Sequence, residues 1–269
     1  MFRSACLSCL LLLALAACQR EPGPAPATPQ APTAAATPAS TPPLQDVVER
    51  DPRYLIGISY PPVANKYPNL AAALKAYADA ARGDLMQAVA GLGDTRPTAP
   101  YDLSLAFSEI AATPQLVAIA ADGSSYTGGA HGNPLLARFV WLPRQDRQLT
   151  ATELIPDPQA WGEIAGYVRE QLLSALSQRV DADAPPPAER AEIVKSASRM
   201  IDEGTAPDPG NFAHFEPVLG ADGKMTALRF VFPPYQVGPY ADGVQTVEVP
   251  AAVLLPKVAP QYRGLFAGG

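Results

Sequence analysis

The side chains best suited to binding or acid–base chemistry lie in two short segments rich in glycine, proline and tyrosine. Residues 126–133 read Tyr-Thr-Gly-Gly-Ala-His-Gly-Asn, and residues 233–243 read Pro-Pro-Tyr-Gln-Val-Gly-Pro-Tyr-Ala-Asp-Gly. An imidazole changes its charge near neutral pH, and a tyrosine combines an apolar ring with a polar hydroxyl. The candidate residues for binding a ligand or partner are Tyr126, Gly128, Gly129, His131, Tyr235, Tyr240 and Asp242.

His131 is one of only two histidines in the chain, and the sequence allows three roles for it. It can lock a tight turn, bind a partner, or act as an acid or base. Catalysis would need a carboxylate such as Asp242 and a nucleophile such as Ser124 or Ser125 within reach. The sequence contains neither Gly-x-Ser-x-Gly nor His-Glu-x-x-His nor a phosphate-binding loop. We therefore assign no catalytic residue and expect neither a metal site nor a cofactor.

The first segment is expected to connect two strands of an N-terminal subdomain, residues 46–150. Apolar residues recur at helical spacing from Leu70 to Val89, which predicts an amphipathic helix capped by Asn69 and ending near Gly91. Apolar runs bounded by turn residues predict strands over residues 54–60, 101–110, 115–121 and 135–142. The last three of these strands follow one another closely, which favours an antiparallel meander lying against the helix.

The second segment is expected to lie between strands of a C-terminal subdomain, residues 151–269. Asp157-Pro158 predicts the start of a helix, because aspartate suits the cap and proline suits the first turn. A more polar helix is expected over residues 188–201. Strands are predicted over residues 211–219 (which places His214 inside a strand), 225–232 and 244–249, with Asp222-Gly223 as a hairpin turn. The whole pattern predicts an α+β fold: antiparallel meander sheets with packed helices, in two intimate subdomains.

The N-terminus is similar to the signal of a bacterial lipoprotein. Arg3 precedes an apolar run from Leu10 to Ala17 that is too short to span a bilayer, and Leu-Ala-Ala-Cys ends at Cys18. We expect a signal peptide over residues 1–17 and a lipidated Cys18 that attaches the protein to a membrane. The alternative is an ordinary secretory cleavage site with a free thiol. Gln19 after the cysteine favours the outer membrane, facing the periplasm.

Residues 18–45 are expected to form a disordered tether, because proline, alanine and threonine bury too little apolar surface to offset the entropy of ordering. Cys6 and Cys9 would leave with the signal peptide, so no disulfide is expected. The formal net charge of −6 argues against nucleic acid as a partner and favours a cationic protein.

The two segments together resemble the envelope domain of the RsiV family, a module that also precedes the catalytic domain of PdaC-type peptidoglycan deacetylases. The matching residues are Tyr126, Gly128, Gly129, Ala130, His131, Phe232, Pro234, Tyr235, Val237, Pro239, Tyr240, Ala241 and Gly243. The likeness runs from about Tyr54 to Leu255. RsiV is a lysozyme receptor and anti-sigma factor, so the resemblance implies an extracytoplasmic domain that grips lysozyme. We expect neither anti-sigma nor deacetylase activity, because the sequence offers no sigma-binding segment, spanning helix or deacetylase domain.

These observations favour a non-enzymatic, lipid-anchored envelope domain that binds a protein or a cell-wall ligand, with cationic lysozyme as one partner. The alternative is an enzyme that modifies peptidoglycan, using His131 with a carboxylate such as Asp242. A third hypothesis is a structural envelope lipoprotein whose two segments serve only the fold.

Overall fold

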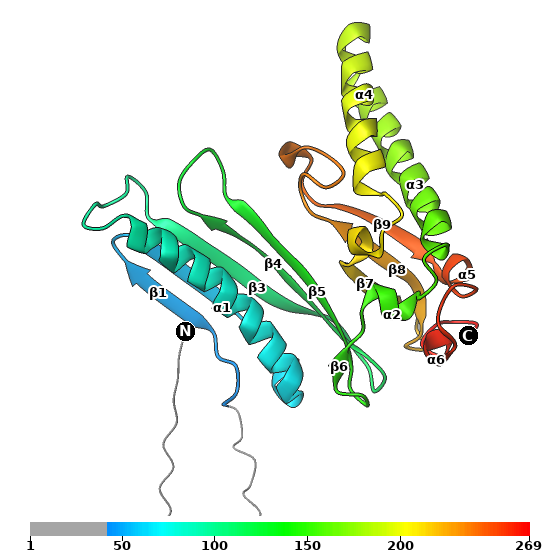
Figure 1. The fold of residues 1–269 in the computed structure, drawn as a ribbon, viewed down its shortest axis with the longest axis horizontal. Helices are drawn as coiled ribbons and strands as arrows, with labels where there is room; N and C mark the ends of the chain where they lie inside the picture. The colour runs from blue at the N-terminus through cyan, green and yellow to red at the C-terminus, as the bar shows by residue number, and fades with distance from the viewer. Residues whose placement is uncertain (1–41) are drawn as a thin grey trace, which may run out of the picture. The chain divides into compact units, whose positions relative to one another are not determined.

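The computed structural model describes residues 42–269, which fall within one compact unit. The expected cleavage site, Cys18 and most of the expected tether lie outside the described residues. A six-stranded sheet and a three-stranded sheet are combined with helices (Figure 1), which confirms the α+β prediction. Within the described part of the chain, no helix combines the length and apolar character needed to cross a membrane.

The six-stranded sheet keeps its strands in chain order. They are β1 (Val47–Asp51), β2 (Tyr54–Ser59), β3 (Tyr101–Ala112), β4 (Val117–Tyr126), β5 (Asn133–Leu142) and β6 (Arg147–Gln148). Strands β3 to β6 form the predicted antiparallel meander, whereas β2 runs parallel to β3. The parallel pair requires a crossover, and helix α1 (Pro68–Gly91) provides it after a short 3-10 turn, η1 (Pro62–Lys66). Strand β1 was not predicted; its residues Val-Val-Glu-Arg-Asp are half-buried at most.

Helix α1 packs on one face of this sheet and forms the first core. The predicted apolar face is confirmed, since Leu70, Leu74, Leu85 and Val89 are all buried. The predicted cap is wrong. Pro68 begins the helix, Tyr67 occupies the N-cap without a side-chain hydrogen bond, and Asn69 instead donates to Asp146 across the surface. A proline at the first helical position loses no hydrogen bond, so no asparagine cap is needed.

The C-terminal half begins with helices. They are α2 (Ala151–Leu154), α3 (Ala160–Asp183) and α4 (Pro187–Gly204). Helix α2 was not predicted, although Thr150 and Glu153 form a capping box at its start. The expected start of α3 at Asp157-Pro158 is wrong by a few residues. The Asp157 carboxylate accepts from the Gln159 amide at 2.9 Å and so caps a turn that precedes the helix.

The three-stranded sheet holds β7 (Phe215–Leu219), β8 (Met225–Phe232) and β9 (Gln245–Pro250), all antiparallel. The predicted hairpin between β7 and β8 is confirmed, and Gly223 has the positive φ of 75° that this turn demands. The strand predicted from residue 211 is wrong over its first half. Residues Pro209–Phe212 form a 3-10 turn, η2, which the Asp208 side chain caps through the Gly210 amide, so His214 lies just before β7.

The remaining elements are short: η3 (Tyr240–Asp242), α5 (Ala251–Leu254) and α6 (Pro260–Arg263). The second core lies between the three-stranded sheet, helix α3 and part of the larger sheet. Alternate residues of β4 and β5 serve the two cores, because successive side chains of a strand point to opposite faces. Ile119 and Trp141 belong to the first core, whereas Ala118 and Val140 belong to the second. The two halves of the chain therefore share these strands.

Candidate binding site at two converging loops

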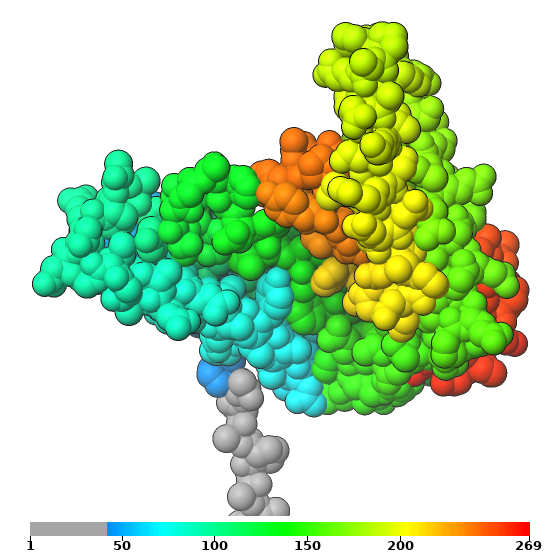
Figure 2. Space-filling model, turned by 45° about the horizontal axis from the view of Figure 1, so that its top comes forward, coloured from blue at the N-terminus to red at the C-terminus, as the bar shows by residue number. Residues whose placement is uncertain are grey.

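The two segments singled out in the sequence meet at the surface, although 104 residues separate them in the chain. The Tyr235 hydroxyl lies 3.0 Å from Nε2 of His131. The ring of Tyr240 stacks on the His131 imidazole, with centroids 3.9 Å apart and planes 15° from parallel. In Figure 2 the green surface that contains the β4–β5 connection abuts the orange surface that contains the β8–β9 connection. We call His131, Tyr235 and Tyr240 the two-loop surface.

The β4–β5 connection presents His131 on a backbone that glycine permits. Gly128 and Gly129 have φ values of 101° and 99°, where a side chain would be strained. The Tyr126 hydroxyl donates to the Gly129 carbonyl at 3.2 Å and braces the turn. Nδ1 of His131 lies 3.1 Å from the Gly132 carbonyl. A carbonyl only accepts, so Nδ1 carries the proton, and in the neutral ring Nε2 accepts from the Tyr235 hydroxyl.

The β8–β9 connection holds Tyr235 outward in a strained conformation. Its φ is 73°, one of three positive values among the described residues other than glycine. The Tyr235 amide donates to the Gly238 carbonyl at 2.9 Å, and the Gln236 amide donates to the Pro233 carbonyl at 3.1 Å. These bonds close a tight turn around Tyr235, and the residue stays 55% exposed. Strained residues held by their surroundings are concentrated at functional sites in proteins.

The end of helix α4 packs against this turn. A Cβ atom added at Gly204 would lie 2.0 Å from the carbonyl oxygen of Gln236, so only glycine allows the helix to approach so closely. The Gln236 side-chain amide donates to the carbonyls of Gly204 and Asn211, at 3.0 and 2.9 Å. Val237 is buried beside it. The loop that carries Tyr235 is therefore anchored to the helical layer.

Asp242 lies in the same loop but is engaged elsewhere. Its carboxylate pairs with Arg179 of α3 at 2.8 Å. Ser124 and Ser125 lie at the base of the β4–β5 hairpin, where Ser125 is opposite Asn133. Over residues 42–269, neither ring nitrogen of His131 is hydrogen-bonded to a carboxylate, and no group of three or more metal-ligating side chains occurs. The structure thus brings together His131, Tyr235 and Tyr240, with Tyr126 and the two glycines supporting them.

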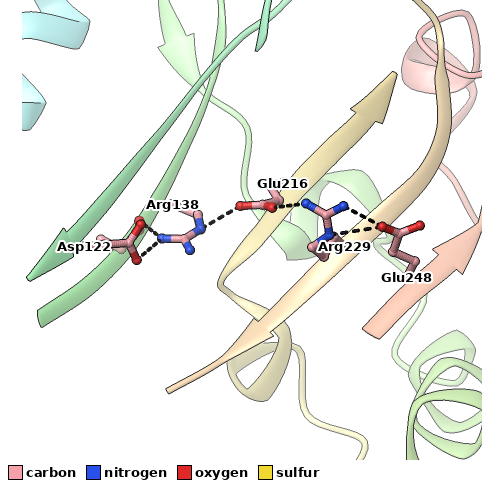
Figure 3. A network of polar contacts seen from close by, with 6 residues as sticks. Asp122, Arg138, Glu216, Arg229 and Glu248 are labelled. Carbon is pink, nitrogen blue, oxygen red and sulfur yellow. Dashed lines mark hydrogen bonds and ion pairs between the residues drawn. The ribbon is translucent and has the colours of Figure 1, made fainter. Parts of the chain in front are cut away.

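A row of alternating charges joins the two sheets (Figure 3). Arg138 of β5 bonds Asp122 of β4 at 2.9 Å and, through Nε, Glu216 of β7 at 2.8 Å. Glu216 in turn accepts from Arg229 of β8 at 2.8 Å, and Arg229 also pairs with Glu248 of β9. The side chains of Arg138 and Glu216 are only 8% and 9% exposed. This row was not predicted from the sequence, although an arginine inside the apolar run of residues 135–142 was a signal of a buried ion pair.

His214, the second histidine, lies apart from the two-loop surface and does not contribute to it. Burial, together with the positive charge of Arg138, lowers the pKa of His214 below its ordinary value. His214 is therefore neutral at neutral pH. Its backbone carbonyl accepts from the Val231 amide at 2.8 Å, which extends the pairing of β7 with β8 by one residue.

Part of the second half of the chain matches the model of a described protein family. Residues 156–252 match DUF3298, a protein family of unknown function. The matched region includes Tyr235, Tyr240 and Asp242 but not His131. No curated protein matches the chain.

Two solved structures are similar to the chain. A DUF3298 family protein from Pseudomonas aeruginosa PAO1 is 17% identical with a TM-score of 0.51, covering 86% of this chain and 99% of its own. A DUF3298 family member from Bacteroides fragilis NCTC 9343 is 16% identical with a TM-score of 0.46, covering 80% of this chain and 89% of its own. At such identities the first likeness establishes the fold alone. It extends well beyond the region that the family model matches.

Proposed function

We propose that this protein is a lipid-anchored domain of the bacterial cell envelope that binds a protein or cell-wall ligand through the two-loop surface, without catalysing a reaction. The observation that carries the proposal is the meeting of His131 with Tyr235 and Tyr240 at the molecular surface. Two separate loops converge there on an exposed aromatic group. Tyrosine is enriched among the residues that dominate binding energy at protein interfaces.

The geometry of Tyr235 supports binding in preference to a purely structural role. A buried tyrosine would contribute to folding through its apolar surface, but Tyr235 is 55% exposed. Its strained backbone is fixed by the turn and by Gly204, so the side chain is held in place before any ligand arrives. Such preorganisation reduces the entropy that a partner must overcome on binding.

The likeness to the RsiV family makes a lysozyme the first partner to test. Lysozymes of that kind are cationic, and this chain carries a formal net charge of −6. Opposite net charges accelerate encounter and make association sensitive to salt. A polymeric cell-wall glycan is the other ligand class, since the faces of Tyr235 and Tyr240 offer flat surfaces for sugar rings.

The proposed anchor is Cys18, with the body facing the periplasm from the outer membrane. The Cys18→Ser variant should lose the mass of the acyl groups and move from the membrane fraction to the soluble periplasmic fraction. Retention of the variant in the membrane would contradict the anchor while leaving the two-loop surface untouched.

The binding test is a titration of the purified protein with lysozyme and, separately, with soluble murein fragments. We expect binding of one of them that weakens at least tenfold, about 1.4 kcal/mol, in Tyr235→Ala. Binding of lysozyme should also weaken as the salt concentration rises. Val48→Ala is the matched control, because Val48 is 71% exposed but lies on β1, away from the two loops.

Failure of both ligands to bind at concentrations of tens of micromolar would remove these two versions of the proposal. The enzymatic alternative predicts instead turnover of murein fragments that is abolished in His131→Ala. That alternative requires a carboxylate partner for His131, and Asp242 is already paired with Arg179.

A further inference from the structure

Among the described residues, strand β9 pairs with β8 alone, so it forms an outer edge of the three-stranded sheet. An open edge presents backbone donors and acceptors that another strand can use. Proteins often protect such edges with a covering loop or helix. Here helix α3 lies beside β9, and the space between them is open.

The register fixes which backbone groups of β9 face outward. The Val231 amide of β8 points away from β9 and donates to the His214 carbonyl. In an antiparallel ladder, a residue bonded to one neighbour is not bonded to the other. Thr246, which is opposite Val231, therefore points its N–H and C=O away from β8, and Glu248 does the same two residues later. Among residues 42–269, no side chain or loop hydrogen-bonds to these groups.

A groove accompanies this edge. A space of about 320 Å³ lies between α3 and β9 and is lined by Gln171, Leu172 and Ala175 on the helix and by residues 245–248 on the strand. At the end near Gln245 it adjoins a second cavity of about 250 Å³. Six of the nine residues that line that cavity are apolar, and the other three are Arg179, Asp242 and Gln245. The apolar residues are Leu172, Ala175, Leu176, Ala197, Ile201 and Val237.

The charges along the groove are already neutralised. Arg179 pairs with Asp242, and Glu248 pairs with Arg229. The other polar side chains that line the groove are uncharged, namely Gln171, Gln245 and Thr246. The groove therefore complements an uncharged segment, and the free edge complements an extended backbone.

We infer that this groove binds an uncharged, extended segment of a partner protein, which adds as a fourth strand beside β9. The backbone of the segment pairs with Thr246 and Glu248, and one apolar side chain enters the 250 Å³ cavity. Strand addition of this kind obtains affinity from main-chain hydrogen bonds and specificity from side-chain pockets. Pro250 ends the usable edge, because it has no N–H to donate. The cavity shares the β8–β9 loop with the two-loop surface through Val237 and Asp242, but neither the groove nor the cavity is lined by His131, Tyr235 or Tyr240.

The test uses two capped octapeptides, one alternating threonine with leucine and the other alternating threonine with alanine. We expect the leucine peptide to bind at least tenfold more tightly than the alanine peptide. Thr246→Pro removes one outward N–H without breaking a bond to β8, so it should weaken binding of the leucine peptide at least tenfold. Thr246→Ala, which keeps the N–H, should bind within twofold of the unmodified protein.

Ala197→Phe tests the cavity independently and decides the question if Thr246→Pro does not fold. By filling the cavity it should abolish the preference for leucine over alanine. Tyr235→Ala should leave peptide binding unchanged, which separates this site from the proposed function. The inference is overturned if neither peptide binds at concentrations up to about 1 mM; a dissociation constant of that size corresponds to a binding free energy near −4 kcal/mol. It is also overturned if Thr246→Pro binds as well as Thr246→Ala, or if the edge is occupied by a second copy of the chain.

Discussion

Tyr235 combines two costs that a purely structural residue would avoid: an exposed ring and a backbone φ of 73°. The left-handed region is unfavourable for residues with a Cβ by roughly 1–2 kcal/mol. No local sequence pattern predicts the contact of Tyr235 with His131. Periodicity and turn signals concern residues that are close in the chain, whereas these two are 104 positions apart. The sequence did identify both segments, through their glycines, tyrosines and family likeness.

The strain at position 235 can be measured with two variants that remove the same side chain. Tyr235→Gly should be more stable than Tyr235→Ala by about 1 kcal/mol, because only glycine adopts this φ without strain. Urea unfolding of both variants measures the difference. Both should bind the partner equally poorly. An alanine variant as stable as the glycine variant would mean that the backbone at Tyr235 stores no strain.

At the level of elements, the site depends on how α4 ends. Helices α1, α3 and α4 were predictable because their apolar or polar faces recur with helical spacing. The first residues of these helices were harder to predict. Asn69 and Asp157 are good capping residues, but α1 already begins at Pro68, and a turn ending at residue 159 separates Asp157 from α3. The approach of Gly204 to the carbonyl oxygen of Gln236 was not predictable, because a glycine at a helix end usually signals only a cap.

Gly204→Ala should therefore act on the two-loop surface from a distance. The added methyl group must push the Gln236 carbonyl away, and overpacking of this kind costs about 1–3 kcal/mol. We expect weaker ligand binding and the loss of the contact between Tyr235 and His131, visible as a changed environment of the His131 ring in NMR spectra. Gly166→Ala in α3 is the control. No atom lies within 4 Å of the added methyl group there, so that variant should be as stable or more stable. Equal behaviour of the two variants would refute the role of Gly204.

At the level of the whole molecule, the charge row from Asp122 to Glu248 joins the two sheets on which the two loops are built. Its central pair is Arg138 with Glu216, both nearly buried. The strands themselves were largely predictable from apolar alternation. The pairing of one sheet with the other was not, because an ion pair between distant strands leaves no periodic trace in the sequence.

Removing one member of this pair leaves the other buried without its partner. We expect Arg138→Met or Glu216→Leu alone to lower the free energy of unfolding by about 3–5 kcal/mol, and the double variant to lose less than the sum. In the double variant Arg229 keeps Glu248, and Asp122, 51% exposed, stays solvated. A double-mutant cycle by urea unfolding measures the coupling. Strictly additive losses would show that the row contributes nothing to joining the sheets.

Strand β1 lies at the rim of the large sheet, and the segment before it is fastened by side chains. The Leu44 amide donates to Asn65 at 2.7 Å, Asn65 donates back to the Leu44 carbonyl at 3.3 Å, and the Tyr60 amide donates to Asp46 at 2.9 Å. A pulling force applied at Pro42 would act on the hydrogen bonds between Leu44 and Asn65 before it acted on the ladder of β1. Under such tension the two hydrogen bonds of Asn65 would break first, and the β1 ladder would open after them.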